Sequence, residues 1–284
     1  MAYLEVLPYL CTTGQQQMAL DRWLLTRFCD GAYGAVGNLA MAMEPMPKDP
    51  KDKDSKDIVP EDTMGCLRFY GWQPHALSLG CHQRQLPNHW QDLCARRGLD
   101  LVQRPSGGRA VLHGGDLTYA LVIRLPHALE SQSRRQIYEW LCGFLIAGLA
   151  ESGIRLNFGN AVRSYRHHPS CFATATAADL VLEDGRKLIG SAQVYRQSSH
   201  SDSKKETFVL QHGSIVLQPD YDLLVEIFGE PTSVAGLLEI LPQYTLTKAI
   251  DLFSQQLTVA ALRYFDLEPL HRNFLVDAPI PQSF

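Results

Sequence analysis

The sequence lacks the features by which several large classes of protein are recognised. Seven cysteines occur among the 284 residues, but none forms a Cys-x-x-Cys pair, so neither a zinc ribbon nor a thioredoxin-type site is supported. The longest apolar stretch, residues 137–150, is interrupted by Glu139 and Trp140 and is too short to span a bilayer. Residues 1–9 lack the basic start and the apolar run of a signal peptide. We therefore expect a protein of the reducing cytoplasm with free thiols.

The chain also lacks an excess of positive charge. It carries 26 basic and 30 acidic side chains, for a formal net charge of −4. No overall field draws it to nucleic acid or to anionic lipid, so we expect neither nucleic acid nor membrane as a partner. An acidic protein partner would have to be met by a local basic patch.

The pattern of apolar residues predicts helices and strands that do not alternate regularly. Helices are predicted over residues 15–29, 87–97, 133–152, 221–228 and 247–265. Strands are predicted over residues 66–70, 76–79, 99–103, 117–125, 180–183, 187–195 and 208–217. This order is typical of an α+β fold. We expect a single domain over residues 1–284, in which residues 218–284 form a closing helical segment.

Residues 43–62 differ in composition from the rest of the chain. They contain four prolines, alternating lysine and aspartate, and almost no apolar side chains. Such a segment cannot bury enough apolar surface to offset the entropy lost on ordering. We interpret it as a disordered insertion within one domain.

The segment RPSGGRAVLH, residues 104–113, follows a predicted strand. Its two adjacent glycines allow a ligand to approach the backbone, and flanking arginines suit an anionic group. It is neither a Walker loop nor a dinucleotide fingerprint, because GK[ST] and GxGxxG are both missing. On its own, such a loop is most often a tight turn. The candidate binding residues in it are Arg104, Ser106, Gly107, Gly108, Arg109, Ala110 and His113.

Two further segments carry polar groups beside small residues. In KLIGSAQ, Lys187 precedes Gly190, Ser191 and Ala192, which leave room for a ligand against the strand. In QHGSIVL, residues 211–217, His212 and Gly213 open an apolar strand. A solvated lysine and a structural histidine are the ordinary interpretations of each segment alone.

Together and in this order, the three segments resemble the lipoate–protein ligase A/octanoyltransferase family, which shares its catalytic fold with biotin protein ligase. The segments MALD, residues 18–21, and LSLG, residues 77–80, resemble opening pieces of that family. The resemblance implies a mixed β-sheet flanked by helices. It also implies that the glycine loop and the Gly190–Ala192 strand wall an acyl pocket, with Lys187 as a catalytic residue that stabilises an oxyanion.

Within the family, Pro169-Ser170-Cys171-Phe172 resembles the cysteine-dependent (LipM) type of octanoyltransferase. The resemblance implies that Cys171 takes octanoate from octanoyl-acyl carrier protein as a thioester. It then passes the acyl group to a lysine of a lipoyl domain protein, such as the glycine cleavage H protein or a dehydrogenase E2 subunit. Thioester exchange is nearly balanced in free energy, so neither a metal nor another cofactor is needed. The other six cysteines are expected to be inert, and the sequence shows no Ser-His-Asp signature.

Three alternatives remain open. An ATP-dependent lipoate–protein ligase on the same fold would need ATP and magnesium, with Lys187 on the acyl-adenylate phosphate. An amidotransferase would move lipoyl or octanoyl groups between two carrier proteins and would need Cys171. A non-catalytic acyl-binding protein would tolerate the loss of both Cys171 and Lys187.

Overall fold

The fold is known from a computed structural model, which describes residues 1–30, 60, 62–159, 179–198, 205–229 and 233–271. Cys171 and most of the insertion predicted over residues 43–62 lie outside these described residues.

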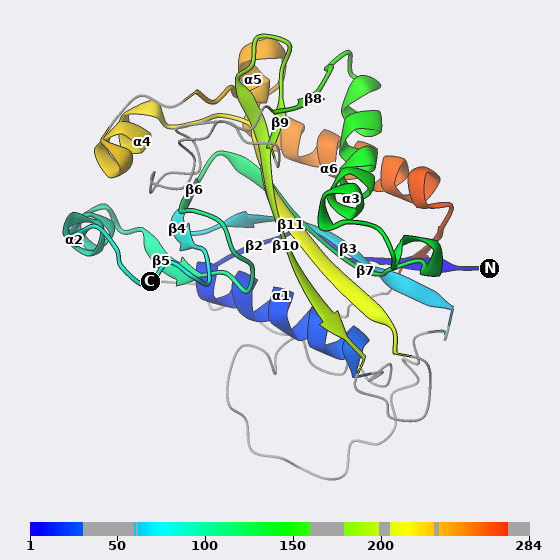
Figure 1. Cartoon of the computed structure of the whole chain (residues 1–284). Helices are drawn as coiled ribbons and strands as arrows, with labels where there is room; N and C mark the ends of the chain where they lie inside the picture. Colours follow the sequence, from blue (N-terminus) through cyan, green and yellow to red (C-terminus); the bar gives the residue numbers. More distant parts are fainter. Residues whose placement is uncertain (31–59, 61, 160–178, 199–204, 230–232, 272–284) are drawn as a thin grey trace, which may run out of the picture.

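A mixed sheet of nine strands forms the centre of the described structure (Figure 1). Its order is β12-β1-β3-β7-β11-β10-β9-β8, with β2 paired to β3. Strands β1, β2 and β12 make parallel pairings, and the pairings from β3 through to β8 are antiparallel. The strands are β1 (Tyr3–Val6), β2 (Leu10–Thr12), β3 (Thr63–Trp72), β7 (Asp116–Arg124), β8 (Asn157–Phe158), β9 (Asp179–Val181), β10 (Lys187–Gln197), β11 (Thr207–Val216) and β12 (Glu268–His271).

A second sheet of three strands, in the order β5-β4-β6, supports the glycine loop. Its strands are β4 (Ala76–Leu79), β5 (Asp100–Gln103) and β6 (Val111–His113). The helices are α1 (Gly14–Cys29), α2 (Asn88–Arg97), α3 (Arg134–Ala150), α4 (Tyr221–Phe228), α5 (Leu237–Ile240) and α6 (Leu246–Phe265), with a short 3-10 turn at His127–Leu129.

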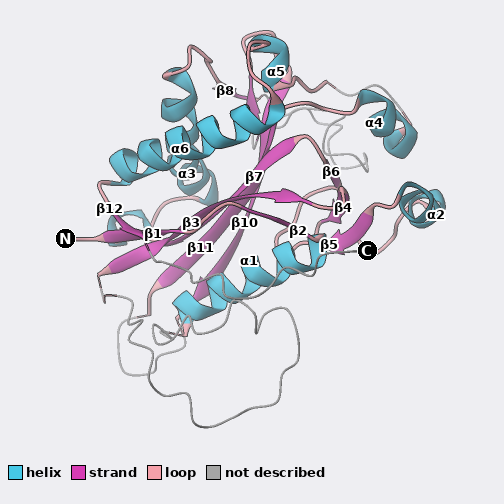
Figure 2. Cartoon of the chain, turned by 180° about the vertical axis from the view of Figure 1, so that it is seen from behind, coloured by secondary structure: helices cyan, strands magenta, loops and turns pink. Residues whose placement is uncertain are grey.

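Alternation along the strands produces two cores, one on each face of the large sheet. On β7, Tyr119 and Leu121 face a core shared with α3 and α6, whereas Ala120 and Val122 face a core shared with α1. Figure 2 shows α3 and α6 together and α1 apart from them across the sheet. A third cluster joins the small sheet to α2 and α4. The sheet is therefore covered by helices on both faces.

The α+β prediction is confirmed, and every predicted helix and strand is present to within a few residues. Local signals account for this, such as the capping boxes of Thr13 with Gln16 and of Ser133 with Gln136. Six elements were not predicted from the sequence, and each has four residues or fewer: β1, β2, β6, β8, β12 and α5. The segment after residue 218 is thus not wholly helical, because β12 returns to pair with β1.

The insertion can be tested by deletion. The carbonyls of Pro60 and Asp62 accept backbone hydrogen bonds from Thr63 and Tyr3, so the last residues of the 43–62 range are tied to the sheet. We expect a chain lacking residues 43–58 to keep the rate of the acyl transfer that the resemblance implies within about twofold. Halving the connection changes its closure free energy by only about 0.6 kcal/mol. Steady-state rates and thermal unfolding of both chains measure this, and a deleted chain that fails to fold would contradict it.

Candidate active site

A pocket opens on the α1 side of the large sheet, beside the first half of α1. Its floor consists of small residues, namely Gly190 and Ala192 on β10, Ser214 on β11 and Thr118 on β7. Its empty space is about 550 Å³, including the part open to solvent. The space exists because small side chains replace the large apolar ones on which α1 packs further along the same strands.

Eight of the fourteen residues predicted from the sequence line this pocket, from the glycine loop, β10 and β11. They are Arg104, Gly108, His113, Gly190, Ser191, Ala192, His212 and Gly213. Ser106, Gly107, Arg109, Ala110 and Lys187 are not part of its wall, and Cys171 lies outside the described residues. Segments about 100 residues apart in the sequence thus converge on one cavity.

The glycine loop is held by the side chain of Arg104, which is almost fully buried. Its Nη1 donates to the carbonyl and the hydroxyl of Ser78, both at 2.7 Å. Its Nη2 donates to the carbonyls of Gly107 at 3.2 Å and Arg109 at 2.8 Å. These four hydrogen bonds fix the loop against β4, so the guanidinium shapes the pocket wall from within the loop.

The loop also needs a glycine from the opposite segment. A Cβ atom on Gly80 would lie 1.9 Å from the carbonyl oxygen of Gly108, and Gly108 has a φ of +96°. Only glycine allows this approach and this backbone conformation without strain. Gly80 ends the LSLG segment noted in the sequence, which explains why that segment accompanies the glycine loop.

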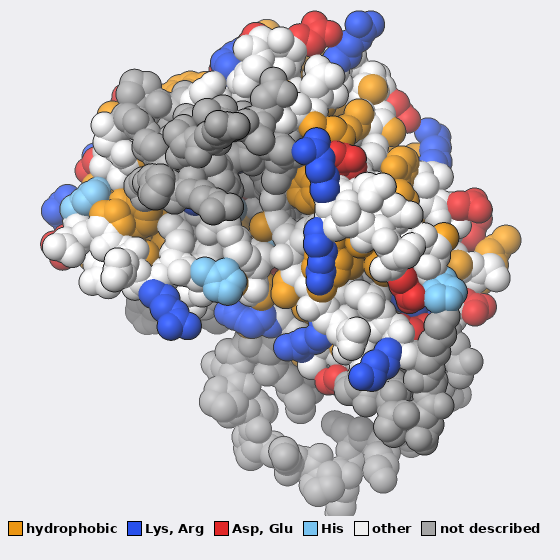
Figure 3. Space-filling view, in the orientation of Figure 1, with side chains coloured by type: hydrophobic (Ala, Val, Ile, Leu, Met, Phe, Trp, Pro, Cys, Tyr) orange, Lys and Arg blue, Asp and Glu red, His pale blue; other side chains and the backbone are white. Residues whose placement is uncertain are grey.

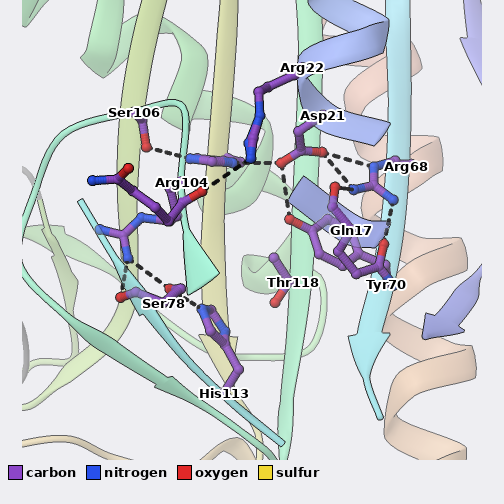
Figure 4. Close-up of polar contacts among 12 residues, drawn as sticks. Gln17, Asp21, Arg22, Arg68, Tyr70, Ser78, Arg104, Ser106, His113 and Thr118 are labelled. Atoms are coloured by element: carbon purple, nitrogen blue, oxygen red, sulfur yellow. Dashed lines mark hydrogen bonds and ion pairs between the residues drawn. The ribbon is translucent and has the colours of Figure 1, made fainter. Parts of the chain in front are cut away.

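A buried chain of hydrogen bonds joins the glycine loop to α1. Ser106 Oγ lies 2.5 Å from His212 Nε2, and His212 Nδ1 lies 2.7 Å from Asp21 Oδ2. Asp21 is also paired with Arg68 at 2.6 Å (Figure 4). Burial alone would raise the pKa of Asp21, but attraction to Arg68 and the hydrogen bond to His212 outweigh it and lower the pKa. Asp21 is therefore ionised, and His212 Nδ1–H donates to it.

A second series of buried hydrogen bonds, again linking a serine, a histidine and an aspartate, lies on the other side of the glycine loop. Ser78 Oγ lies 2.7 Å from His113 Nε2, and His113 Nδ1 lies 2.8 Å from Asp116 Oδ2. Burial lowers the pKa of His113 more than Asp116 raises it, so the ring is neutral at pH 7. Its Nδ1–H then donates to Asp116, and its Nε2 accepts from Ser78. His113 also stacks on Trp72, with ring centroids 4.0 Å apart.

The sequence shows no Ser-His-Asp signature, but the fold brings together two such arrangements from segments distant in the chain. Neither resembles a hydrolase triad in its surroundings. Ser106 and Ser78 are both buried and form no part of the pocket wall. Both arrangements instead end on the glycine loop, at Ser106 directly and at Arg104 through Ser78. We interpret them as braces that hold the loop over the pocket.

One brace is tested by Ser106→Ala. Removing the hydroxyl leaves His212 Nε2 buried without this hydrogen-bond partner, and we expect a loss of about 1–3 kcal/mol in the free energy of unfolding. Urea denaturation measures this, with the exposed Ser131→Ala as the matched control. A loss of stability as small as that of the control would show that Ser106 does not brace the loop.

Lys187 does not have the exposed position that a hairpin lysine would suggest. Its side chain is 1% exposed, and its Nζ lies 2.7 Å from Asp179 Oδ1. A Cβ atom on Gly190 would lie 2.5 Å from this Nζ, so the ammonium occupies the space above Gly190. Asp179 and Gly190 both line the pocket. The buried pair therefore sits at the end of the cavity formed by β9 and β10.

Six cysteines belong to the described residues, and none lines the pocket. Burial raises the pKa of Cys11, Cys29, Cys66, Cys94 and Cys142, to about 12 for Cys142. A thiol with a raised pKa is a poor nucleophile at pH 7, since the thiolate is the reactive form. For these five thiols the raised pKa favours the inertness expected from the sequence, which stays a prediction.

Several site residues were missed in the sequence, although Asp21 left a signal. It falls between Met18 and Leu25 on the apolar face of α1, where an unpaired carboxylate would be costly. A carboxylate in that row indicates a buried cationic or histidine partner. Asp179, Tyr70, Trp72 and Thr118 left no such signal, because they lie in ordinary strand contexts. Among the described residues, no cluster of metal-binding side chains occurs and no helix could cross a membrane.

Comparison with known proteins agrees with this geometry. The sequence model of the lipoyl protein ligase A/B catalytic domain matches residues 38–258. The chain belongs to this family. Its lipoyl ligase A/B catalytic domain thus includes the glycine loop, the Lys187 hairpin and the His212 strand.

Curated relatives of this lipoyl ligase A/B domain are named octanoyltransferase LipM. That of Clostridioides difficile is 32% identical over 212 residues, covering 74% of this chain and 72% of the relative. That of Symbiobacterium thermophilum is 36% identical over 177 residues, which is 59% of each chain. The latter match spans less than two thirds of the relative's own length.

Solved structures of similar fold are lipoate ligases. The bipartite lipoate protein ligase of Thermoplasma acidophilum superposes with a TM-score of 0.63 at 16% identity, over 96% of this chain and 87% of that one. A lipoate-protein ligase A bound with ATP gives a TM-score of 0.65 at 15% identity, over 96% and 90%. At such identities these structures show a shared fold. The lipoate-ligase-like fold predicted from the three segments is confirmed.

Proposed function

We propose that this protein is a cysteine-dependent octanoyltransferase of lipoate biosynthesis. It moves an octanoyl group from acyl carrier protein to Cys171 and then to a lysine of a lipoyl domain protein. The observation that carries the acyl-transfer role is the pocket, which has apolar walls and a buried ammonium at one end. The name of the curated relatives and the presence of Cys171 favour a transferase over a ligase.

The pocket suits a medium-length acyl chain. Met18, Tyr70, Trp72 and Val111 supply apolar surface, and the small side chains of Ala192 and Ser214 leave space above the floor. Burial of eight methylene-sized units contributes at most about 6 kcal/mol, at about 0.8 kcal/mol each. This is enough to select an acyl chain from water.

In the proposed reaction, the Cys171 thiolate attacks the thioester carbonyl of octanoyl-acyl carrier protein. The carbon–sulfur bond to the carrier breaks, its thiolate leaves, and an octanoyl-Cys171 thioester remains. The acceptor lysine amine then attacks this thioester, loses a proton and forms an amide, while the Cys171 thiolate leaves. Lys187, held by Asp179, stabilises the oxyanion of each step. No metal or nucleotide is consumed, and a reducing cytoplasm belongs to the proposal because Cys171 must stay a free thiol.

Both protein substrates would meet a face that carries arginines. Figure 3 shows Lys and Arg side chains across the middle and lower part of this face. Arg22 on α1 and Arg196 on β10 are exposed and bind Gln103 O and Thr26 Oγ1, and Arg134 lies over the Tyr195 ring. Such a surface favours acidic partners although the net charge is −4. It supports acyl carrier protein as donor and a lipoyl domain as acceptor.

The main alternative is an ATP-dependent lipoate–protein ligase, which would use ATP and magnesium. One observation weighs against it. The guanidinium of Arg104, one of the two arginines that flank the glycine loop, makes four hydrogen bonds to the loop and to Ser78. The Nη1 and Nη2 donors of Arg104 are thus already used in hydrogen bonds within the protein.

The test is intact-mass analysis after mixing the protein with octanoyl-acyl carrier protein in the absence of ATP. We expect one octanoyl adduct, released by neutral hydroxylamine as a thioester. Absence of the adduct, together with release of pyrophosphate from octanoate and ATP, would assign the protein to the ligases.

A further inference from the structure

The strand register places four pocket residues in one row across the large sheet. Gly190 on β10 pairs with Ser214 on β11, Ser214 with Thr118 on β7, and Thr118 with Tyr70 on β3. All four line the pocket. Because residues in register lie side by side, the row marks the direction in which the floor of the pocket crosses the sheet.

The side chains in this row grow from one end to the other. Glycine, serine and threonine leave space above three strands, and the tyrosine ring stands above the fourth. At the glycine end, the Lys187 ammonium occupies the space above Gly190. Charge stabilises a polarised carbonyl, so the carbonyl end of an acyl group belongs at Gly190. Its methyl end then points along the row toward Tyr70.

Tyr70 is held in place more firmly than an ordinary core tyrosine. It is 0% exposed, and its hydroxyl donates to Asp21 Oδ2 at 3.2 Å. The Arg68 guanidinium lies 3.8 Å from the ring centroid, and Trp72 lies 5.6 Å from it, centroid to centroid. Burial, with the neighbouring Asp21, raises the pKa of Tyr70, so the hydroxyl remains a donor. Figure 4 shows Tyr70 beside Asp21, Gln17 and Arg68. The ring cannot swing away to admit a longer chain without breaking these contacts.

The row has the length that an eight-carbon chain requires. Three inter-strand steps of about 4.8 Å separate Gly190 from Tyr70, about 14 Å between backbones. An extended octanoyl chain, with C–C bonds of about 1.5 Å, is about 9 Å long. The remainder is taken up by the lysine at one end and the tyrosine ring at the other.

We propose that Tyr70 is the end wall of the acyl pocket and that it determines the length of the acyl chain. This inference rests on the proposed acyl-transfer function, because it takes the pocket to hold an acyl group. It adds a specificity-determining residue that acts by filling space at the methyl end. Met18, which lines the same pocket and belongs to the same core cluster as Tyr70, completes this wall.

The experiment measures binding of free saturated fatty acids of six, eight, ten and twelve carbons to the full chain by calorimetry. The wild type should bind the eight-carbon acid most tightly. In Tyr70→Leu the optimum should move to ten or twelve carbons, with the ten-carbon acid gaining about tenfold relative to the eight-carbon acid, since two more methylenes become buried. Tyr70→Phe keeps the ring and should keep the wild-type optimum. A folded Tyr70→Leu with the wild-type optimum would overturn the proposal.

Loss of the Asp21 contact could prevent Tyr70→Leu from folding, so Met18→Ala is measured in parallel, with the volume-conserving Met18→Leu as control. Met18→Ala should move the optimal chain length in the same direction as Tyr70→Leu. An unchanged optimum in Met18→Ala would also contradict the proposed end wall. The readout is independent of transfer chemistry. If the protein formed no octanoyl adduct but showed these shifts, the proposed transferase function would be wrong and Tyr70 would still be the end wall of the pocket. If it formed the adduct without the shifts, the transferase function would be supported and the role of Tyr70 would be wrong.

Discussion

Cys171→Ala should abolish both the covalent octanoyl adduct and the transfer of octanoate to a lipoyl domain. The reason is that none of the six thiols of the described residues lines the pocket, and burial raises the pKa of five of them. Intact-mass analysis with octanoyl-acyl carrier protein measures the adduct, and a gel-shift or mass assay of the acceptor measures transfer. Cys171→Ser should trap a stable ester, because an alkoxide leaves less readily than a thiolate.

The matched control is Cys81→Ala. Cys81 is partly exposed and lies beside the glycine loop, where its backbone N–H donates to the Ser106 carbonyl. This variant should keep the adduct and the transfer rate. Formation of an acyl-adenylate from octanoate and ATP by Cys171→Ala would contradict the proposed mechanism and show that Cys171 is incidental.

Lys187→Ala should lower the rate of both half-reactions by at least about 100-fold, the scale of losing one group that stabilises transition-state charge. The structure adds a second effect, which the hairpin position alone did not predict. Removing the ammonium breaks the buried pair between Lys187 and Asp179, and breaking a buried pair costs about 3–5 kcal/mol of stability. Single-turnover rates and urea denaturation separate the two effects.

The control for Lys187 is a double variant, Lys187→Met with Asp179→Asn. It removes both charges, so it should recover most of the lost stability while the rate stays low. Recovery of the rate together with the stability would show that the pair is structural only. Near-normal turnover in Lys187→Ala would have the same meaning.

The sequence predicted most of the fold because its signals are local. The helices carry capping boxes and apolar faces, as in α1 and α3, and the longer strands, such as β7 and β11, are apolar-rich segments buried on both faces. The missed strands are of four residues or fewer, and β1, β2 and β12 make parallel pairings with segments distant in the chain. No local pattern encodes such pairings, since they are decided by what lies beside them in the folded sheet.

The residues of the candidate site were also predicted only in part from the sequence. The glycine loop, Lys187 and His212 were found from short motifs and their order. What these residues do depends on partners that lie far away in the chain, such as Asp21 for His212 and Ser78 for Arg104. The role of Lys187 as a buried member of a pair with Asp179, rather than an exposed lysine, became visible only when β9 was placed beside β10.

By itself, the sequence determined the family, the class of fold and eight of the residues that line the pocket. It could do so because motif order and helix periodicity are properties of the linear chain. The tertiary structure decided which of those residues face the cavity, which two histidines brace the loop, and where the acyl chain ends. These properties depend on strand register across β10, β11, β7 and β3, which aligns Gly190 with Tyr70 although 120 residues separate them in the chain.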